Sequence, residues 1–346
     1  MEIELFNYHL PEDQLALFPA SRRDGSRLMA LDRRSGEISL QKFSDIKEYF
    51  RAGDALVVNN TRVFKARLFS RRATGGKVEV FLLEEVKYDN KVCWEVLTHP
   101  TRRVREGEPL FIDEDNSFKV LRKLPNGRTI IHFSSRAEAS RLISKFGHVP
   151  LPVYIHRPDQ NSDEKRYQTV YAQKSKDKSV AAPTAGLHFT NRILSSLKEM
   201  GVKIIPITLH VGYGTFKPVK AANIEDHTVD PEFAEISKSS AKAINRVRQK
   251  GGRIFAVGTT SVRTLESAEM VKGEIQPLNR PVDLYIRPGF KFRVVDHMIT
   301  NFHLPRSSLI ILVSAFAGRE NILRAYQTAV ENKYRFYSYG DCMLIL

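Results

Sequence analysis

Apolar and polar positions along the chain change their spacing twice, and these changes divide it into three segments. In residues 1–62 the apolar runs are short and separated by polar turns. They predict helices at Leu10–Leu17 and Ser44–Phe50 and strands at Arg27–Asp32 and Asp54–Asn59. The first segment therefore mixes helices with strands.

From about Val63 to Pro152 the spacing becomes that of half-buried strands. Val78, Val80 and Leu82 alternate with polar residues, which is the period of a strand with one buried face. Turn-forming Asn, Asp, Gly and Pro separate further runs of this kind. These runs lie at Val92–Leu97, Pro109–Ile112, Phe118–Leu121 and Thr129–Phe133. Short strands at such intervals predict a small antiparallel barrel or sandwich.

Capping residues mark the helices in the remainder. Ser135 and Glu138 form a capping box, and the helix that they open should stop at Gly147. After Val153, strands at Ile204–Thr208 and Arg253–Val257 alternate with helices at Thr190–Met200, Ser239–Lys250, Ser261–Met270, Ser308–Ala317 and Glu320–Asn332. This alternation predicts an α/β layer on a largely parallel sheet. We therefore expect an α/β base domain, residues 1–62 and 153–346, with an inserted antiparallel β-barrel domain at 63–152.

The net charge of the chain indicates the kind of partner that it binds. Lys and Arg number 54 against 39 Asp and Glu, an excess that favours a polyanion such as tRNA, DNA or an anionic membrane. The inserted segment carries 17 basic against 11 acidic residues, which indicates RNA contact or a solvated surface. The strongly apolar stretch Leu309–Ala317 is too short to cross a bilayer. The first ten residues lack the basic region of a signal peptide, and two distant cysteines suit a reducing cytosol.

Four segments place Gly, Thr and His where predicted strands end. The sequence has neither a P-loop nor a GxGxxG after a strand, so these segments carry the candidate chemistry. Ligands of open α/β sheets gather at the carboxyl ends of strands, where these loops should meet. Taken singly, a loop histidine is more often structural, and Gly-x-Gly is usually a turn. The segments are Ala181–Thr190, Thr208–Phe216, Ala256–Glu266 and Thr300–Pro305.

The same segments carry a resemblance to a known family. AAPTAGLHFT (Ala181–Thr190), RYQTVYA (Arg166–Ala172), GDALVVNNTRVFKARL (Gly53–Leu68) and YRFYSYGDCMLI (Tyr334–Ile345) closely resemble the S-adenosylmethionine:tRNA ribosyltransferase-isomerase family. The resemblance implies an α/β domain with an inserted β-barrel. It also implies that the ribosyl group of S-adenosylmethionine is transferred and isomerised onto 7-aminomethyl-7-deazaguanine at the wobble position of tRNA. The products are epoxyqueuosine-tRNA, adenine and methionine.

The implied reaction needs a base for a C5′ proton beside the sulfonium and an acid for adenine. No step calls for a metal or a redox cofactor, so we expect S-adenosylmethionine as co-substrate and no metal. We expect a cytoplasmic monomer that does not bind membranes. Candidates for proton transfer are His188, His210, His303, His227 and Glu232. Candidates for substrate binding are Thr184, Gly186, Gly212, Gly214, Thr215, Phe216, Thr259, Thr260, Arg263 and Asn301. We predict that His188, His210, His303 and Arg263 face one cavity.

Three positions depart from the family pattern. The family usually has His-x-Met-His-x-Glu where this chain has Asp230 in place of the second His. Arg287 replaces a usual tyrosine, and Asn60 replaces a usual aspartate before Thr61. These departures leave open a tRNA-binding homologue that has lost the chemistry. A third possibility is a methyltransferase with the same co-substrate, which would release S-adenosylhomocysteine.

Overall fold

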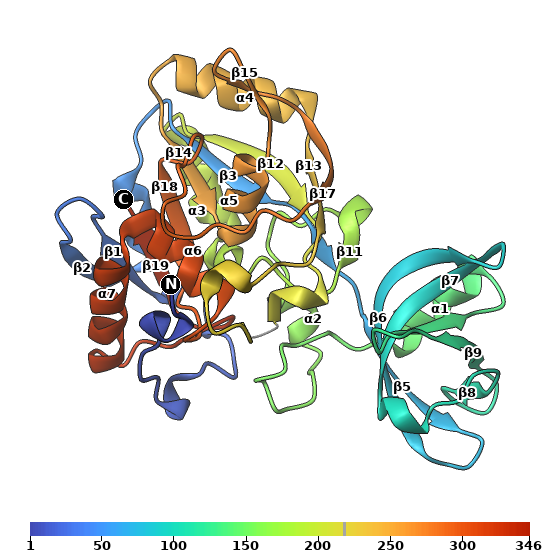
Figure 1. Cartoon of the computed structure of the whole chain (residues 1–346). Helices are drawn as coiled ribbons and strands as arrows, with labels where there is room; N and C mark the ends of the chain where they lie inside the picture. Colours follow the sequence, from blue (N-terminus) through green and yellow to red (C-terminus); the bar gives the residue numbers. More distant parts are fainter. Residues whose placement is uncertain (217–218) are drawn as a thin grey trace.

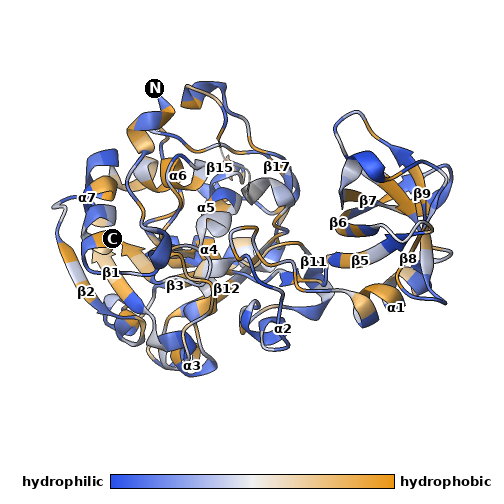
Figure 2. Cartoon of the chain, turned by 90° about the horizontal axis from the view of Figure 1, so that it is seen from below, coloured by the Kyte–Doolittle hydropathy of each residue, from blue (hydrophilic) through white to orange (hydrophobic). Residues whose placement is uncertain are grey.

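The computed structural model describes residues 1–216 and 219–346, without the side chains of Thr215 and Phe216. It shows an α/β layer that contains both chain ends and a β-barrel beside it (Figure 1). The two parts also lie side by side in the perpendicular view of Figure 2. Within the described residues, no helix has both the length and the apolar character that a membrane crossing requires.

Nine strands of the described chain form one mixed sheet, in the order β17-β13-β12-β3-β14-β18-β19-β1-β2. The central strands β12, β3, β14 and β18 run parallel, and β1 runs parallel to β19, whereas the other neighbours are antiparallel. The prediction of a largely parallel sheet therefore holds for its centre and for the pair β1–β19, but not for the other neighbours. The bounds are β1 Arg27–Leu31, β2 Ile38–Lys42, β3 Ala55–Asn59, β12 Lys203–Leu209, β13 Glu232–Ile236, β14 Ile254–Val257, β17 Leu278–Val282, β18 His297–Asn301 and β19 Cys342–Ile345.

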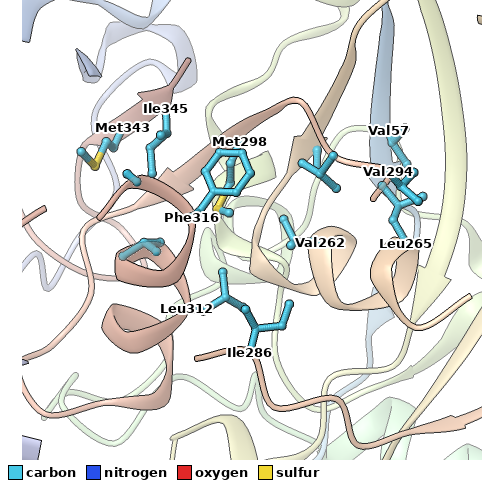
Figure 3. Packing of buried hydrophobic residues seen from close by; sticks show 14 of the residues in the cluster. Val57, Val262, Leu265, Ile286, Val294, Met298, Leu312, Phe316, Met343 and Ile345 are labelled. Atoms are coloured by element: carbon cyan, nitrogen blue, oxygen red, sulfur yellow. The ribbon is translucent and has the colours of Figure 1, made fainter. Parts of the chain in front are cut away.

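Helices cover both faces of this sheet. All of β3 is buried because its alternate side chains enter two cores: Leu56 and Val58 pack with α3, and Val57 packs with the helices of the opposite face. In Figure 3, Val262 of α5 and Phe316 of α6 lie close to Met298 of β18. The helices are α3 Asn191–Glu199, α4 Lys238–Gln249, α5 Thr259–Glu266, α6 Ser308–Ala317 and α7 Arg319–Glu331, with a short α2 at Asp163–Arg166.

The predicted barrel is confirmed. Within residues 67–132 six antiparallel strands close in the order β10-β7-β6-β5-β8-β9, with inward apolar residues such as Leu82 and Val96 fully buried. Helix α1, Arg136–Phe146, begins at the Ser135 cap and packs Leu142 under the barrel. The strands are β5 Arg67–Arg72, β6 Lys77–Tyr88, β7 Lys91–His99, β8 Pro109–Phe111, β9 Ser117–Lys123 and β10 Thr129–His132. Short pairs elsewhere are β4 Arg62–Val63 with β11 Asp177–Ser179, and β15 Met270–Val271 with β16 Glu274–Ile275.

Three predicted helices differ from the structure. Only Glu12–Gln14 of the first forms a 3-10 turn, because backbone groups of Gln14 and Ala16 bond to Phe336 instead. The second is a 3-10 helix at Phe43–Tyr49. The third, α5, begins two residues earlier than expected and ends at Glu266, because residues 270–271 pair with β16.

Candidate functional site

All four strand-end segments meet in one pocket, which we call the strand-end pocket. It lies at the carboxyl ends of β14 and β18, and its polar side chains are threonines, one asparagine, one serine, one tyrosine and one histidine. Thr184 Oγ1 donates to Asn301 Oδ1 at 2.8 Å, so the first and fourth segments are joined across the pocket. The residues that line it include Ala181–Ala185, Val211, Gly258–Thr260, Thr300, Asn301, His303, Leu309, Tyr337 and Ser338.

The tight turn between β14 and α5 forms part of the lining of this pocket. Gly258 has a φ of 87°, a conformation that side chains other than glycine rarely adopt, and its N–H donates to Ile299 O at 2.7 Å. It is the N-cap of α5 and provides no side chain, so Thr259 and Thr260 enter the pocket at a helix amino end. Such an end favours oxygen-rich or anionic ligand groups.

A second pocket adjoins the first and shares Leu309 with it; we call it the Arg263 pocket. The guanidinium of Arg263 is buried and donates through Nη1 to Glu232 Oε2 and through Nε to Leu284 O at 3.1 Å. Glu232 Oε1 also accepts from Gly212 N at 2.8 Å. The pocket is lined by Gly214, His227–Asp230, Glu232, Arg263, Leu284–Ile286, Ser308, Leu309 and Leu312.

Among the predicted histidines, His303 lines the strand-end pocket. Its Nε2 lies 2.8 Å from Thr300 Oγ1, and its backbone N–H donates to the hydroxyl of Tyr326. Burial lowers the pKa of His303 to about 3, so the ring is neutral near pH 7. His227 is half-buried in the Arg263 pocket against the ring of Tyr285, and burial lowers its pKa.

The prediction of one cavity for His188, His210, His303 and Arg263 is wrong. His188 lies behind the strand-end pocket, where its Nδ1 contacts Ser26 Oγ at 2.8 Å and its Nε2 accepts from Asn301 at 3.2 Å. Asn301 thus stands between this ring and the pocket. His210 bonds to Thr61 Oγ1 at 2.8 Å and stacks on Phe233, and it lines neither pocket. Burial lowers the pKa of both rings to about 4.

The remaining predicted residues are spread around the two pockets. Gly186 packs under the hydroxyl of Tyr171, Gly212 bonds to Glu232, and neither lines a pocket described above. Phe189, in the first of the four segments, is a fully buried core residue that packs against Phe43. Of the segment Tyr213–Phe216, a 3-10 turn, the predicted contacts of the Thr215 and Phe216 side chains lie outside the described residues.

The positions that depart from the family pattern differ in their surroundings. Asn60 is buried and accepts from Thr208 Oγ1 at 2.7 Å. Arg287 is exposed, and Asp230 lines the Arg263 pocket, where its carboxylate leaves no room for a Cβ at Gly214. Only Asp230 among the three therefore faces a pocket described here.

Two tyrosines line these pockets although they were not among the predicted site residues. Tyr285 lines the Arg263 pocket, and its buried hydroxyl has no hydrogen-bond partner in residues 1–216 or 219–346. Tyr337 lines the strand-end pocket with a φ of 73°, a strained value for an aromatic residue. Strain of this kind is concentrated at functional sites. Tyr337 lies in the motif Tyr334–Ile345, and Tyr285 lies two residues before Arg287, so these positions were the available signal.

Comparison with known proteins identifies the family. Residues 3–345 match the family described as queuosine biosynthesis protein. The chain belongs to this family. An S-adenosylmethionine:tRNA ribosyltransferase-isomerase of Aquifex aeolicus is 48% identical to it, and one of Syntrophotalea carbinolica is 46% identical, each over 100% of both chains.

A solved structure agrees with this membership. The crystal structure of an S-adenosylmethionine tRNA ribosyltransferase from Thermotoga maritima is 36% identical, with a TM-score of 0.57, over 99% of this chain and 100% of its own. These findings confirm the predicted family, the predicted fold class and the prediction that the protein is an enzyme. The comparisons favour an enzyme over a homologue without activity.

The two buried histidines His188 and His303 should make the stability of the protein depend on pH. His188 and His303 have folded pKa values of about 4 and about 3, below the ordinary 6.5, so the unfolded chain binds more protons. Their stabilisation is complete above pH 6.5 and declines as pH falls toward 4, by about 1.4 kcal/mol per pH unit for each ring. We expect the melting temperature to fall between pH 7 and pH 5. The fall should be smaller in His188→Gln, and a flat wild-type profile would contradict both assignments.

Proposed function

We propose that this protein transfers and isomerises the ribosyl moiety of S-adenosylmethionine onto 7-aminomethyl-7-deazaguanine at the wobble position of tRNA. The products are epoxyqueuosine-tRNA, adenine and methionine. The observation that carries this proposal is the meeting of four strand-end segments in one pocket, lined in part by Thr, Asn and His side chains, beside a buried arginine. The full-length relatives named for this reaction support it.

The chemistry assigns a task to each kind of side chain. The positive sulfur acidifies the C5′ protons. The imidazole of His303 is unprotonated at neutral pH and can accept such a proton, although its lowered pKa makes it a weak base. The C5′ carbanion expels the ring oxygen from C4′, which leaves a vinyl sulfonium, and the freed oxygen becomes the C1′ aldehyde as protonated adenine departs. The aminomethyl nitrogen of the tRNA base then adds to C4′ and loses a proton. The carbanion regenerated at C5′ adds to the C1′ aldehyde and closes the carbon ring, and the resulting alkoxide displaces methionine from C5′ as a neutral thioether to form the epoxide. Thr184, Asn301, Thr259 and Thr260 are placed to hold ribose hydroxyls and the purine.

The assay that tests this function measures released adenine. Purified protein, S-adenosylmethionine and tRNA that carries the aminomethyl base should yield one adenine per modified base. Release of S-adenosylhomocysteine would instead identify a methyltransferase, and tRNA binding without any product would identify a non-catalytic homologue. We further propose that the protein acts in the cytoplasm as a monomer. Sedimentation with and without tRNA tests the monomeric state.

We also propose that residues 63–152 are a separate domain that contacts the tRNA. Tyr213 packs against Phe81 of β6 at 5.4 Å and is followed by Gly214 of the Arg263 pocket, so the barrel adjoins the site. The barrel segment has an excess of six positive charges. Its turn around Thr101–Arg103 exposes Arg102, Arg103 and Arg105 to solvent.

Reversing these three charges to Glu should weaken tRNA binding and flatten its dependence on salt. Each lost phosphate contact lowers the slope of log affinity against log salt by about one. The matched control reverses Lys238, Lys242 and Arg246 on the exposed face of α4, which changes the net charge equally. Equal slopes for the two variants would place the RNA elsewhere.

A further inference from the structure

The Arg263 pocket contains two buried hydrogen-bond donors that none of the described residues satisfies. Nη2 of Arg263 and the hydroxyl of Tyr285 have no partner among the described residues. The other nitrogens of the guanidinium are held by Glu232 and Leu284 O, so the group is fixed with one edge unsatisfied. A buried donor left without a partner costs free energy, and a ligand acceptor would remove that cost.

The walls of the pocket determine what kind of acceptor fits. Leu284, Ile286 and Leu312 are apolar, and Figure 3 shows Ile286 and Leu312 near one another. Apolar walls exclude water and strengthen a charged hydrogen bond. A planar carboxylate matches the edge of a guanidinium. Burial raises the pKa of Tyr285 to about 12, so its hydroxyl remains a donor.

Acidic side chains in the same pocket argue against a phosphate. Glu232 already lies on one side of the guanidinium, and the carboxylate of Asp230 lines the pocket. A dianion would be repelled by these groups, whereas an α-amino acid offers an ammonium to them and a carboxylate to the donors. The pocket therefore fits a zwitterionic amino acid group.

We infer that the Arg263 pocket binds the methionyl end of S-adenosylmethionine, with its α-carboxylate between Arg263 and Tyr285. This inference rests on the proposed function and adds an orientation to it. Because the two pockets share Leu309, a single molecule spans them with its nucleoside in the strand-end pocket. The sulfonium and C5′ then lie at the junction. Tyr285 becomes a residue that selects for an intact amino acid group.

Tyr285→Phe is the most informative variant, because it removes only a hydroxyl without a described partner. With S-adenosylmethionine, kcat/KM for adenine release should fall about 10-fold, the effect of one hydrogen bond to a charged group. With the decarboxylated analogue, S-adenosyl-3-methylthiopropylamine, the wild type should be about 100-fold less active and Tyr285→Phe should cause no further loss. The matched control is Tyr334→Phe. The hydroxyl of Tyr334 is buried and bonds to Leu28 O at 3.4 Å, and Tyr334 lines neither pocket. This variant should behave like the wild type with both substrates.

Binding of L-methionine, measured by calorimetry, tests the pocket without turnover. Wild type should bind methionine but not 3-methylthiopropylamine, and Tyr285→Phe should bind methionine about 10-fold more weakly. An equal loss in Tyr285→Phe with both nucleoside substrates, or equal binding of methionine and the amine, would overturn the inference. A wild type that binds methionine in this way but releases no adenine would instead overturn the proposed function.

Discussion

Replacing His303 with Gln should slow adenine release about 100-fold or more. His303 lines the strand-end pocket, and its Nδ1 makes no hydrogen bond with the described residues, whereas Nε2 is held by Thr300. Gln can keep a bond to Thr300 but cannot accept a proton from C5′. Positioned general bases typically contribute about 10²–10⁴ in rate. Single-turnover measurements with saturating S-adenosylmethionine would show the loss directly, with the affinity for the co-substrate unchanged.

His297→Gln is the matched control for this variant. His297 lies on the same strand, β18, but at its amino end, against Phe255 and away from both pockets. Burial lowers its pKa to about 4, so both substitutions remove a neutral imidazole. We expect the control to retain the wild-type rate. If His303→Gln also retained it, the base would have to be sought in the Arg263 pocket, at His227 or Asp230.

The low pKa of His303 also predicts the pH profile of the wild type. A base that titrates near pH 3 is already deprotonated throughout the neutral range. Titration of His303 should therefore cause no inflection in the rate between pH 6 and pH 8. The pH profiles of the wild type and of His303→Gln should have the same shape in this range. An unburied imidazole would instead titrate near pH 6.5 and give an inflection there.

Replacing Arg263 with Met should destabilise the protein by about 3–5 kcal/mol. The variant leaves Glu232 as a buried charge without its arginine, and breaking one partner of such a pair typically costs this much. Urea denaturation measures the loss. The double variant Arg263→Met/Glu232→Gln should recover a large part of it, because the amide oxygen can still accept from Gly212 N.

The double-mutant cycle distinguishes a buried pair from two independent residues. A double variant as unstable as the sum of the single ones would show that Arg263 and Glu232 are not coupled. Lys176→Met is a useful comparison, since its ion pair with Glu235 at 2.6 Å is more exposed. That change should cost about 1 kcal/mol or less.

The sequence predicted elements best where local signals decide them. The Ser135 cap, the start of α6 and the alternation along β6 depend on neighbouring residues, and they match the structure closely. The helix expected at Leu10–Leu17 failed because its backbone groups pair with Phe336, over 300 residues away. Strands such as β13 and β19 were missed for a similar reason, since long-range pairing makes them strands.

The candidate site shows the same division. Strand-end position predicted that Thr259 and Asn301 converge, because the parallel strands β14 and β18 bring their carboxyl ends to one edge. Thr184 reaches the same pocket from a loop after β11, which lies outside the large sheet. Strand-end position could not predict in which direction a histidine side chain points from its loop. His188 points to Ser26 and Asn301, which are distant in sequence, and Tyr285 enters its pocket from an irregular segment after β17.

The position of β19 has a consequence for the order in which the protein is made. Residues 342–345 form an interior strand between β18 and β1, so the pairing of β1 joins positions more than 300 residues apart. During synthesis β1 and β2 leave the ribosome first, but they reach the rest of the sheet only when the last strand has emerged. The barrel strands pair with near neighbours in sequence and can close much earlier. The nascent chain therefore carries a finished barrel beside an α/β layer that is completed last.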